Sequence, residues 1–211
     1  MTEERKKASE VAAKVLSVLF HPIFIPLYGL MVLYSFPTLL SYMPTNIKRM
    51  IMIMVVSNNI VLPLAIATLL YTRGTLKSVY VRERGERNIL LTFCFVMYAL
   101  TAFLLLKLPV ASLFRAYFLS IAAVTLAALI INTFYRISLH ATGIGGLLAI
   151  SVCMILVFHV VSVPFIVLLV LLSGAVLSAR LYLEEHEPAE VWLGMLTGAS
   201  VTGVILFFFL R

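Results

Sequence analysis

The chain has 211 residues, of which 63% are hydrophobic and 12% are charged, and its mean hydropathy is +1.10. Soluble domains carry roughly 25% charged residues, so this composition excludes a water-soluble fold. The formal net charge is +7, yet the bases alternate with glutamates in short loops and build no continuous basic stripe, which argues against a nucleic-acid partner. Membrane lipids are the expected surroundings, and anionic head groups or phosphate are the expected partners.

Apolar runs along the chain are long enough to cross a bilayer, which takes about 20 residues for about 30 Å of hydrocarbon. We predict an all-α, polytopic transmembrane helical bundle of six to seven spans that forms a single integral membrane domain over residues 1–211. His21, Pro22 and Pro26 interrupt the first run, which predicts a kinked or broken helix. The predicted spans are 11–36, 50–71, 89–106, 110–135, 143–160, 163–179 and 191–210.

Charged residues collect on one face of the predicted bundle. Counting each span as one crossing puts the N-terminus and the loops 72–88, 136–142 and 180–190 on the same side of the membrane. All nine carboxylates, every one a glutamate, and eleven of the sixteen lysines and arginines lie there. A purely structural bundle has no need to gather acids and bases in three loops, and ionisable groups at membrane depth are usually functional. We therefore expect a functional site at this face.

The same charges bear on orientation. The lysine and arginine count favours a cytoplasmic location for the charged face. Leaving out the five residues that could belong to a site reduces the count to six against five, so the sequence leaves the orientation and the oligomeric state open. The five residues left out are Lys77, Arg84, Arg87, Arg136 and Arg180.

The loop 180–190 holds the most informative pattern, because an arginine ends one span and a histidine precedes the next. Pro188 suits the first turn of a helix. His186 and Glu190 are four residues apart, so on a helix they share a face and the carboxylate can accept a hydrogen bond from the imidazole. This arrangement fixes the tautomer of His186 and leaves its other nitrogen free to act as a nucleophile.

The two other charged loops supply further groups for an anion. In the loop 136–142, Ser138 and His140 stand just ahead of a predicted helix, where free backbone N–H groups favour an anion. The loop 72–88 adds cations, and arginine forks suit phosphate oxygens. The candidate cations are Lys77, Arg84 and Arg87. The three loops together predict a phosphate-handling site.

These patterns resemble the three signature motifs of the type 2 phosphatidic acid phosphatase superfamily, in the same order. Lys77-x6-Arg84 resembles the first motif, Ser138-x-His140 the second, and Arg180-x5-His186-x3-Glu190 the third. Arg87 is an alternative to Arg84 as the arginine of the first motif. The resemblance covers roughly residues 77–198, and within the superfamily the chain looks like a short, divergent bacterial membrane member from Bacteroidetes-like bacteria.

The resemblance implies a phosphatase-like core over about 72–210, with accessory spans over about 11–71, in a multi-pass protein of the bacterial inner membrane. It implies that His186 attacks phosphorus to give a phosphohistidine, that Glu190 orients it, and that His140 protonates the leaving alkoxide. No metal or other cofactor is required by this chemistry. The implied phosphate-binding residues are Ser138, Arg180, Lys77 and either Arg84 or Arg87.

The motifs also depart from the family pattern. Gly85 follows Arg84 where the family has proline. Leu139 precedes His140 where the family usually has glycine. Glu190 replaces an aspartate and is one methylene longer, which changes how the imidazole is held. These departures favour fold membership over activity.

The resulting hypothesis is a metal-independent membrane phosphatase that hydrolyses a lipid phosphomonoester or pyrophosphate, phosphatidate-like or polyprenyl. The alternative is a non-catalytic lipid-phosphate binding or transport protein with a degenerate site. His186 and Glu190 also have the helical spacing of metal ligands, but the nearby cations disfavour a divalent ion. His21 and His159 are interpreted as packing or interface residues, and Arg136 as a residue that contacts lipid or sets topology.

Overall fold

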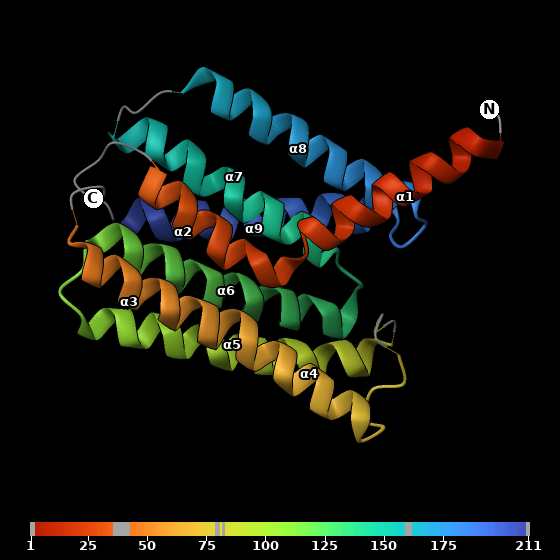
Figure 1. Cartoon of the computed structure of the whole chain (residues 1–211), viewed down its shortest axis with the longest axis horizontal. Helices are drawn as coiled ribbons and strands as arrows, with labels where there is room; N and C mark the ends of the chain where they lie inside the picture. Colours follow the sequence, from red (N-terminus) through yellow and green to blue (C-terminus); the bar gives the residue numbers. More distant parts are fainter. Residues whose placement is uncertain (1–2, 36–42, 79–80, 82, 159–161, 210–211) are drawn as a thin grey trace.

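Figure 1 shows a bundle of long helices that run roughly side by side. The computed structural model describes residues 3–35, 43–78, 81, 83–158 and 162–209, and the regular elements within them are all helical. In chain order they are α1 (Glu3–Leu19), η1 (Pro22–Phe24), α2 (Ile25–Ser35), α3 (Thr45–Val56), η3 (Ser57–Val61), α4 (Leu62–Thr72), α5 (Arg84–Lys107), α6 (Ser112–Phe134), α7 (Leu139–Phe158), α8 (Val163–Tyr182) and α9 (Pro188–Phe209).

Seven helical stretches are long and apolar enough to cross a membrane, which confirms the predicted all-α bundle. Large apolar side chains such as Leu156, Leu171 and Phe208 remain more than 60% exposed, as expected of surfaces that face lipid. The predicted span ends at 36, 160 and 210 lie outside the described residues. The stretches are Glu3–Ser35, Thr45–Thr72, Arg84–Lys107, Ser112–Phe134, Leu139–Leu156, Val163–Tyr182 and Pro188–Phe209.

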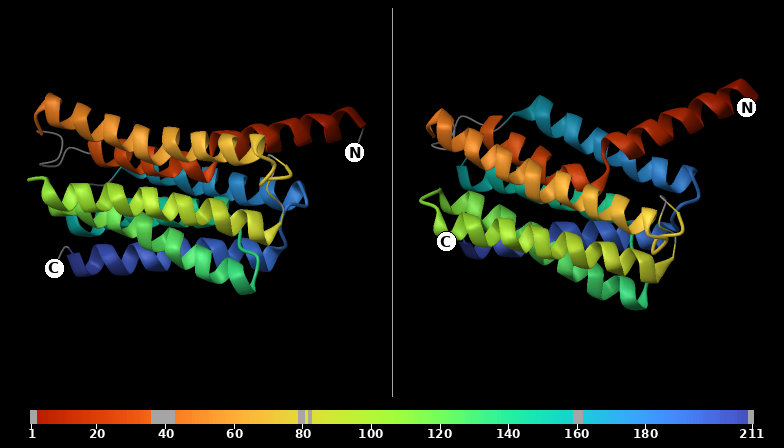
Figure 2. Two further views of the ribbon diagram at one scale, coloured as in Figure 1. Left: turned by 90° about the horizontal axis from the view of Figure 1, so that it is seen from below. Right: turned by 60° about the horizontal axis from the view of Figure 1, so that its bottom comes forward.

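The first span breaks at His21, as the sequence predicts. α1 ends before this residue, the short 3-10 helix η1 follows, and α2 then begins at Ile25. Nδ1 of His21 accepts a hydrogen bond from the backbone N–H of Ile23 at 3.3 Å, so the imidazole caps η1 where Pro22 interrupts the regular helix. The break lets α1 extend past the end of the bundle while α2 packs within it (Figures 1 and 2).

The second span contains a feature that the sequence analysis did not predict. α3 and α4 form one crossing, joined by the π-helical turn η3 at Ser57–Val61. Pro63 follows directly and has no N–H to continue the α-helical ladder, which accounts for a wider turn at this place. Asn59 in η3 is fully buried and accepts a 2.7 Å hydrogen bond from the Thr101 hydroxyl of α5. The turn therefore ties this span to α5.

Glycines allow α7 and α9 to pack at very close range. A Cβ atom at Gly198 would collide with the backbone oxygen of Thr142, and one at Gly145 would collide with the backbone oxygen of Met195. Small residues at such positions let the backbones of membrane helices approach each other. This packing matters for function because α7 and α9 each begin at the charged end of the bundle.

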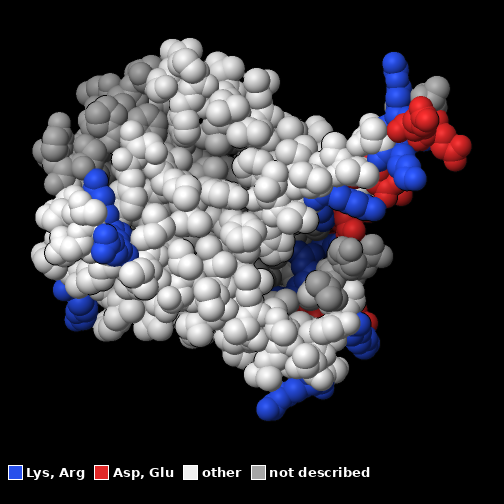
Figure 3. All heavy atoms as spheres, in the orientation of Figure 1, with Lys and Arg blue, Asp and Glu red and all other residues white. Residues whose placement is uncertain are grey.

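The charged loops gather at one end of the bundle, as the sequence analysis expected. The start of α1 and the connections α4 to α5, α6 to α7 and α8 to α9 lie at the same end, and α9 finishes at the opposite end (Figures 1 and 2). On the face seen in Figure 3, the acidic side chains appear at this end alone, together with many of the basic ones.

Candidate functional site

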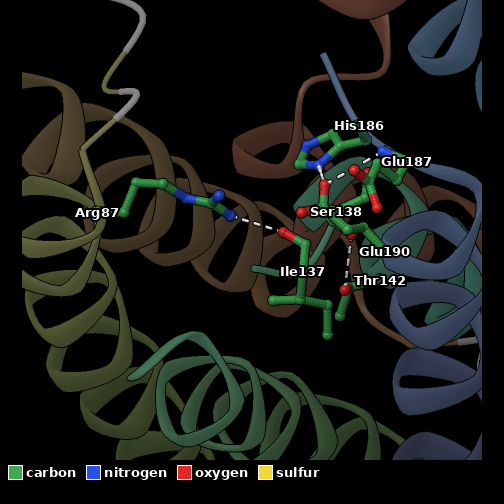
Figure 4. A network of polar contacts seen from close by, with 7 residues as sticks. All are labelled: Arg87, Ile137, Ser138, Thr142, His186, Glu187 and Glu190. Atoms are coloured by element: carbon green, nitrogen blue, oxygen red, sulfur yellow. Dashed lines mark hydrogen bonds and ion pairs between the residues drawn. The ribbon is translucent and has the colours of Figure 1, made fainter. Parts of the chain in front are cut away.

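The pair formed by His186 and Glu190 stands at the start of α9. α8 ends at Tyr182, a short connection follows, and Pro188 begins α9 with Glu190 in its first turn. His186 donates a 2.6 Å hydrogen bond from Nδ1 to Oε2 of Glu190, which also accepts from the backbone N–H of Glu187 at 3.4 Å (Figure 4). The two side chains are only 6% and 11% exposed, so the pair is shielded from solvent.

This hydrogen bond determines the chemistry of the imidazole. With Nδ1 committed to the carboxylate, Nε2 of neutral His186 keeps its lone pair. The pKa of His186 is lowered to about 4, chiefly by burial and also by the positive charges of Arg136 and Arg180, whereas the hydrogen bond and charge of Glu190 act to raise it. His186 is therefore neutral near pH 7 and has a nitrogen available for attack on an electrophile.

Two hydrogen bonds hold the connection between α6 and α7, one to this pair and one to α5. The backbone N–H of Ser138 donates to the carbonyl oxygen of Glu190 at 3.2 Å. From the other side, Arg87 of α5 donates from Nη2 to the carbonyl oxygen of Ile137 at 2.6 Å (Figure 4). Residues from three charged segments, far apart in sequence, thus meet at one place.

His140 lies in the first turn of α7 and contacts the end of α1. Its Nε2 donates to the carbonyl oxygen of Ser17 at 3.0 Å, because a carbonyl can only accept. Arg180, in the last turn of α8, donates to the hydroxyl of the same serine at 3.1 Å. The ring of His21 stands edge-on to that of His140, with 5.6 Å between ring centres. The broken first span is therefore part of the site.

These groups border a cavity of about 500 Å³. Its polar end is lined by three histidines and three arginines with one glutamate, Glu185, so cations exceed acids there. Figure 3 shows basic side chains inside a hollow on the side of the molecule. The histidines and arginines of this lining are His21, His140, His186, Arg87, Arg136 and Arg180.

The predicted site residues fall into two groups. His186, His140, Arg87 and Arg180 line the cavity, and Glu190 is hydrogen-bonded to one of them. The remaining three, Lys77, Arg84 and Ser138, are not among its lining residues.

Each of these three has other contacts or surroundings. Lys77 is exposed and pairs with Glu83 at 2.8 Å, a hydrogen bond that raises the pKa of its amine. Arg84 is exposed and donates to the carbonyl oxygen of Phe134 at 3.3 Å. Ser138 is fully buried, and its hydroxyl has no hydrogen-bond partner among the described residues. Arg87, rather than Arg84, is thus the arginine of its segment that reaches the cavity.

Arg136, His21 and Ser17 are not among the site residues predicted from the sequence. Arg136 lines the cavity, although the sequence analysis interpreted it as a lipid or topology residue. His21 was interpreted as a packing residue, but its place at a proline break in a membrane span was a usable signal. No sequence pattern points to Ser17, because it contacts His140 through its backbone carbonyl, a group that every residue has. His159 lies outside the described residues.

Within the part of the chain that the structure describes, no group of three or more histidine, cysteine or acidic side chains is placed to hold a metal ion. The donor set around the cavity is instead rich in cations, which suits an anion. No protein family model, no curated protein and no solved structure matches the chain. The interpretation of the site therefore rests on its own residues and geometry.

Proposed function

We propose that this chain is an integral membrane phosphatase that hydrolyses a phosphomonoester or pyrophosphate carried by a lipid, by way of a phosphohistidine at His186. The observation that carries the proposal is the convergence of His140, His186 and three arginines on one cavity within a membrane bundle. The resemblance to the type 2 phosphatidic acid phosphatase motifs points in the same direction, with Arg87 in place of Arg84.

Charge supports a bound phosphate. Arg136 and Arg180 both line the cavity, and the Nε atom of each is buried without an acceptor among the described residues. Buried guanidinium N–H groups that lack acceptors are costly, and a phosphate anion would supply both negative charge and hydrogen-bond acceptors. Arg87 adds a third guanidinium to the same cavity. Phosphoryl transfer depends chiefly on such positioning and charge stabilisation.

The proposed reaction has two steps. Nε2 of His186 attacks phosphorus, the bond from phosphorus to the lipid oxygen breaks, and protonated His140 gives its proton to that oxygen. Water then attacks the phosphohistidine, His140 takes a proton from it, and the bond from nitrogen to phosphorus breaks to release phosphate. Glu190 accepts the Nδ1 hydrogen bond throughout and offsets the positive charge on His186 during the first step.

A second candidate function is favoured by two specific observations. Nε2 of His140 is occupied by the Ser17 carbonyl, and the Ser138 hydroxyl is buried away from the cavity lining. Both observations suit a protein that binds a lipid phosphate and does not turn it over. This candidate shares the anion site but requires no proton transfer by His140.

Turnover of lipid phosphates by purified protein in lipid nanodiscs, with EDTA present, tests the proposal. We expect His186→Ala to lower the rate by at least about a thousandfold, as for the loss of a catalytic nucleophile. Glu187→Gln is the matched control, because this exposed neighbour acts at the site through its backbone N–H, and it should keep the wild-type rate. An acid-labile phosphoryl group should be trapped on His186.

Wild-type turnover by His186→Ala would refute the phosphohistidine mechanism. Binding of lipid phosphates without turnover by the wild-type protein, and with equal affinity in His140→Ala, would select the second candidate.

A further inference from the structure

The cavity continues from its polar end into the bundle as an apolar channel, here called the inner limb. Much of its lining comes from α4, α5 and α6, whose one residue among the histidines and arginines of the polar end is Arg87. The inner limb is defined by Leu64 and Ala67 of α4, Leu91, Cys94 and Tyr98 of α5, and Tyr117, Val124 and Ala128 of α6.

Two antiparallel helices give the same depth for the inner limb. On α5 the cavity is lined from Arg87 to Tyr98, and on α6 from Ala128 to Tyr117. Each interval is eleven residues, which is about 16 Å at the rise of an α-helix. The hydrocarbon layer is about 30 Å thick. The inner limb therefore reaches roughly to the middle of the membrane.

The cavity is also open sideways. Leu64 and Tyr71 of α4 line it while remaining 46% and 47% exposed, so its border lies on the lipid-facing surface of the bundle. α1 packs on α8, and α4 packs on α5. The hollow with basic side chains in Figure 3 lies between the regions that Figure 1 labels α1 and α4. A molecule within the bilayer can thus approach the arginines without leaving the membrane.

We propose that the inner limb binds an apolar chain of the lipid substrate while its phosphate lies among Arg87, Arg136 and Arg180, and that the substrate enters between α1 and α4. The inference rests on the proposed function and names its substrate class: a phosphate ester whose flexible hydrocarbon chain is at least as long as the inner limb is deep. Because the chain moves from one apolar medium to another, it gains little hydrophobic free energy and serves to hold the phosphate at the level of the arginines.

The two cysteines of the chain provide a direct test. Cys94 lines the inner limb, whereas Cys153 is partly buried elsewhere and is not among its lining residues. In nanodiscs, hexadecyl phosphate at ten times its Kd should slow the reaction of Cys94 with N-ethylmaleimide about tenfold, because about one tenth of the sites stay free. Cys153, measured in the same sample by peptide mass spectrometry, should react at an unchanged rate.

Inorganic phosphate and hexadecanol separate the two parts of the ligand. Neither should protect Cys94 at the same concentration, because one lacks the chain and the other lacks the anion. An unchanged Cys94 rate with hexadecyl phosphate, or equal protection by hexadecanol, would overturn the inference, whether or not the protein has phosphatase activity.

A pair of variants on α4 connects the inner limb to turnover. Ala67 lines it, while Ala65, two residues away on the same helix, is exposed and is not among its lining residues. Ala67→Phe should slow hydrolysis of hexadecyl phosphate about tenfold or more and leave hydrolysis of butyl phosphate unchanged, while Ala65→Phe affects neither. Equal rates for the two variants on hexadecyl phosphate would contradict the chain site, and absence of wild-type hydrolysis of both esters would contradict the phosphatase proposal instead.

Discussion

Hydrogen bonds leave each of the three histidines of the site with a different free group. Nδ1 of His186 donates to a carboxylate and Nε2 of His140 donates to a carbonyl, so their neutral rings keep lone pairs on Nε2 and Nδ1 respectively. Nδ1 of His21 accepts from a backbone N–H, which places its proton on Nε2. His186 is thus equipped to attack, His140 to take up a proton on Nδ1 and give it to the leaving oxygen, and His21 to donate a hydrogen bond.

In a plot of kcat/KM against pH, the fall on the acid side, here called the acid limb, should report the pKa of His186. The attacking species is the neutral ring, and its pKa of about 4 means that, on the acid side of the profile, kcat/KM should not fall until the pH drops towards 4. Arg136→Gln removes a charge that lowers this pKa, so the limb should move to higher pH. Glu190→Gln removes a hydrogen bond and a charge that raise it, so the limb should move to lower pH. Shifts of both variants in one direction would contradict the assignment.

The same titration has a consequence for stability. The pKa of His186 in the folded protein lies below the value of 6.5 for an unperturbed histidine. The sign follows from linkage: the neutral buried ring contributes stability that is fully present above pH 6.5 and is lost as the pH falls through about 4.

The sequence could not decide which arginine of the charged loop 72–88 belongs to the site. Arg84 fits the Lys-x6-Arg spacing from Lys77 and Arg87 is its alternative just ahead of the predicted span, and both extend from the first turn of α5. One reaches the cavity because its side chain is buried against the carbonyl of Ile137, whereas the other stays exposed near Phe134. That choice depends on how α5 is rotated against α6, which no local pattern encodes.

At the scale of elements, hydropathy was sufficient to predict the membrane spans, but it could not predict the break and the π-turn within them. The proline after His21 predicted the break of the first span, because a missing N–H interrupts any helix. Pro63 has the same chemistry, yet it produced a π-turn and not a break. The difference is tertiary: buried Asn59 bonds to Thr101 of α5 and holds the two halves of the second span in one helix.

The close packing of α7 on α9 should be essential for the site, because the two helices carry His140 and Glu190. Gly198→Ala places a methyl group against the backbone oxygen of Thr142, and such overpacking costs typically about 1 to 3 kcal/mol. We expect a lower Tm in detergent and a weaker hydrogen bond between Ser138 and Glu190. Gly203→Ala on the same helix is the control, because a Cβ there meets nothing within 4 Å. Equal Tm values for the two variants would show that the packing tolerates separation.

At the scale of the whole molecule, counting crossings was enough to place the charged loops on one face, because each span reverses the direction of the chain. It could not bring the loops into contact. Contact depends on the break at His21, which lets Ser17 reach both His140 and Arg180 from a segment outside the motif pattern. The sequence therefore predicted the face that carries the site, and the tertiary fold determined its members.

The structure also sharpens the orientation of the molecule. Lys77 and Arg84 are exposed, so of the residues set aside in the sequence count, only the cavity-lining Arg87, Arg136 and Arg180 belong to the site. Eight lysines and arginines then remain on the face with the site against five on the other. The excess of positive charge predicts that the site faces the cytoplasm.

Labelling of single cysteines in a Cys94→Ser, Cys153→Ser background tests this orientation in intact bacterial cells. Asn46→Cys, exposed at the start of α3, should react with a membrane-impermeant maleimide from outside. Glu4→Cys and Gly85→Cys, exposed at the end with the site, should react only after lysis. The reverse pattern would place the phosphate site on the outer face, where released phosphate leaves the cell. Labelling of Glu4→Cys and Gly85→Cys from opposite sides would contradict the arrangement of the spans itself, since the first two crossings must return the chain to the same face.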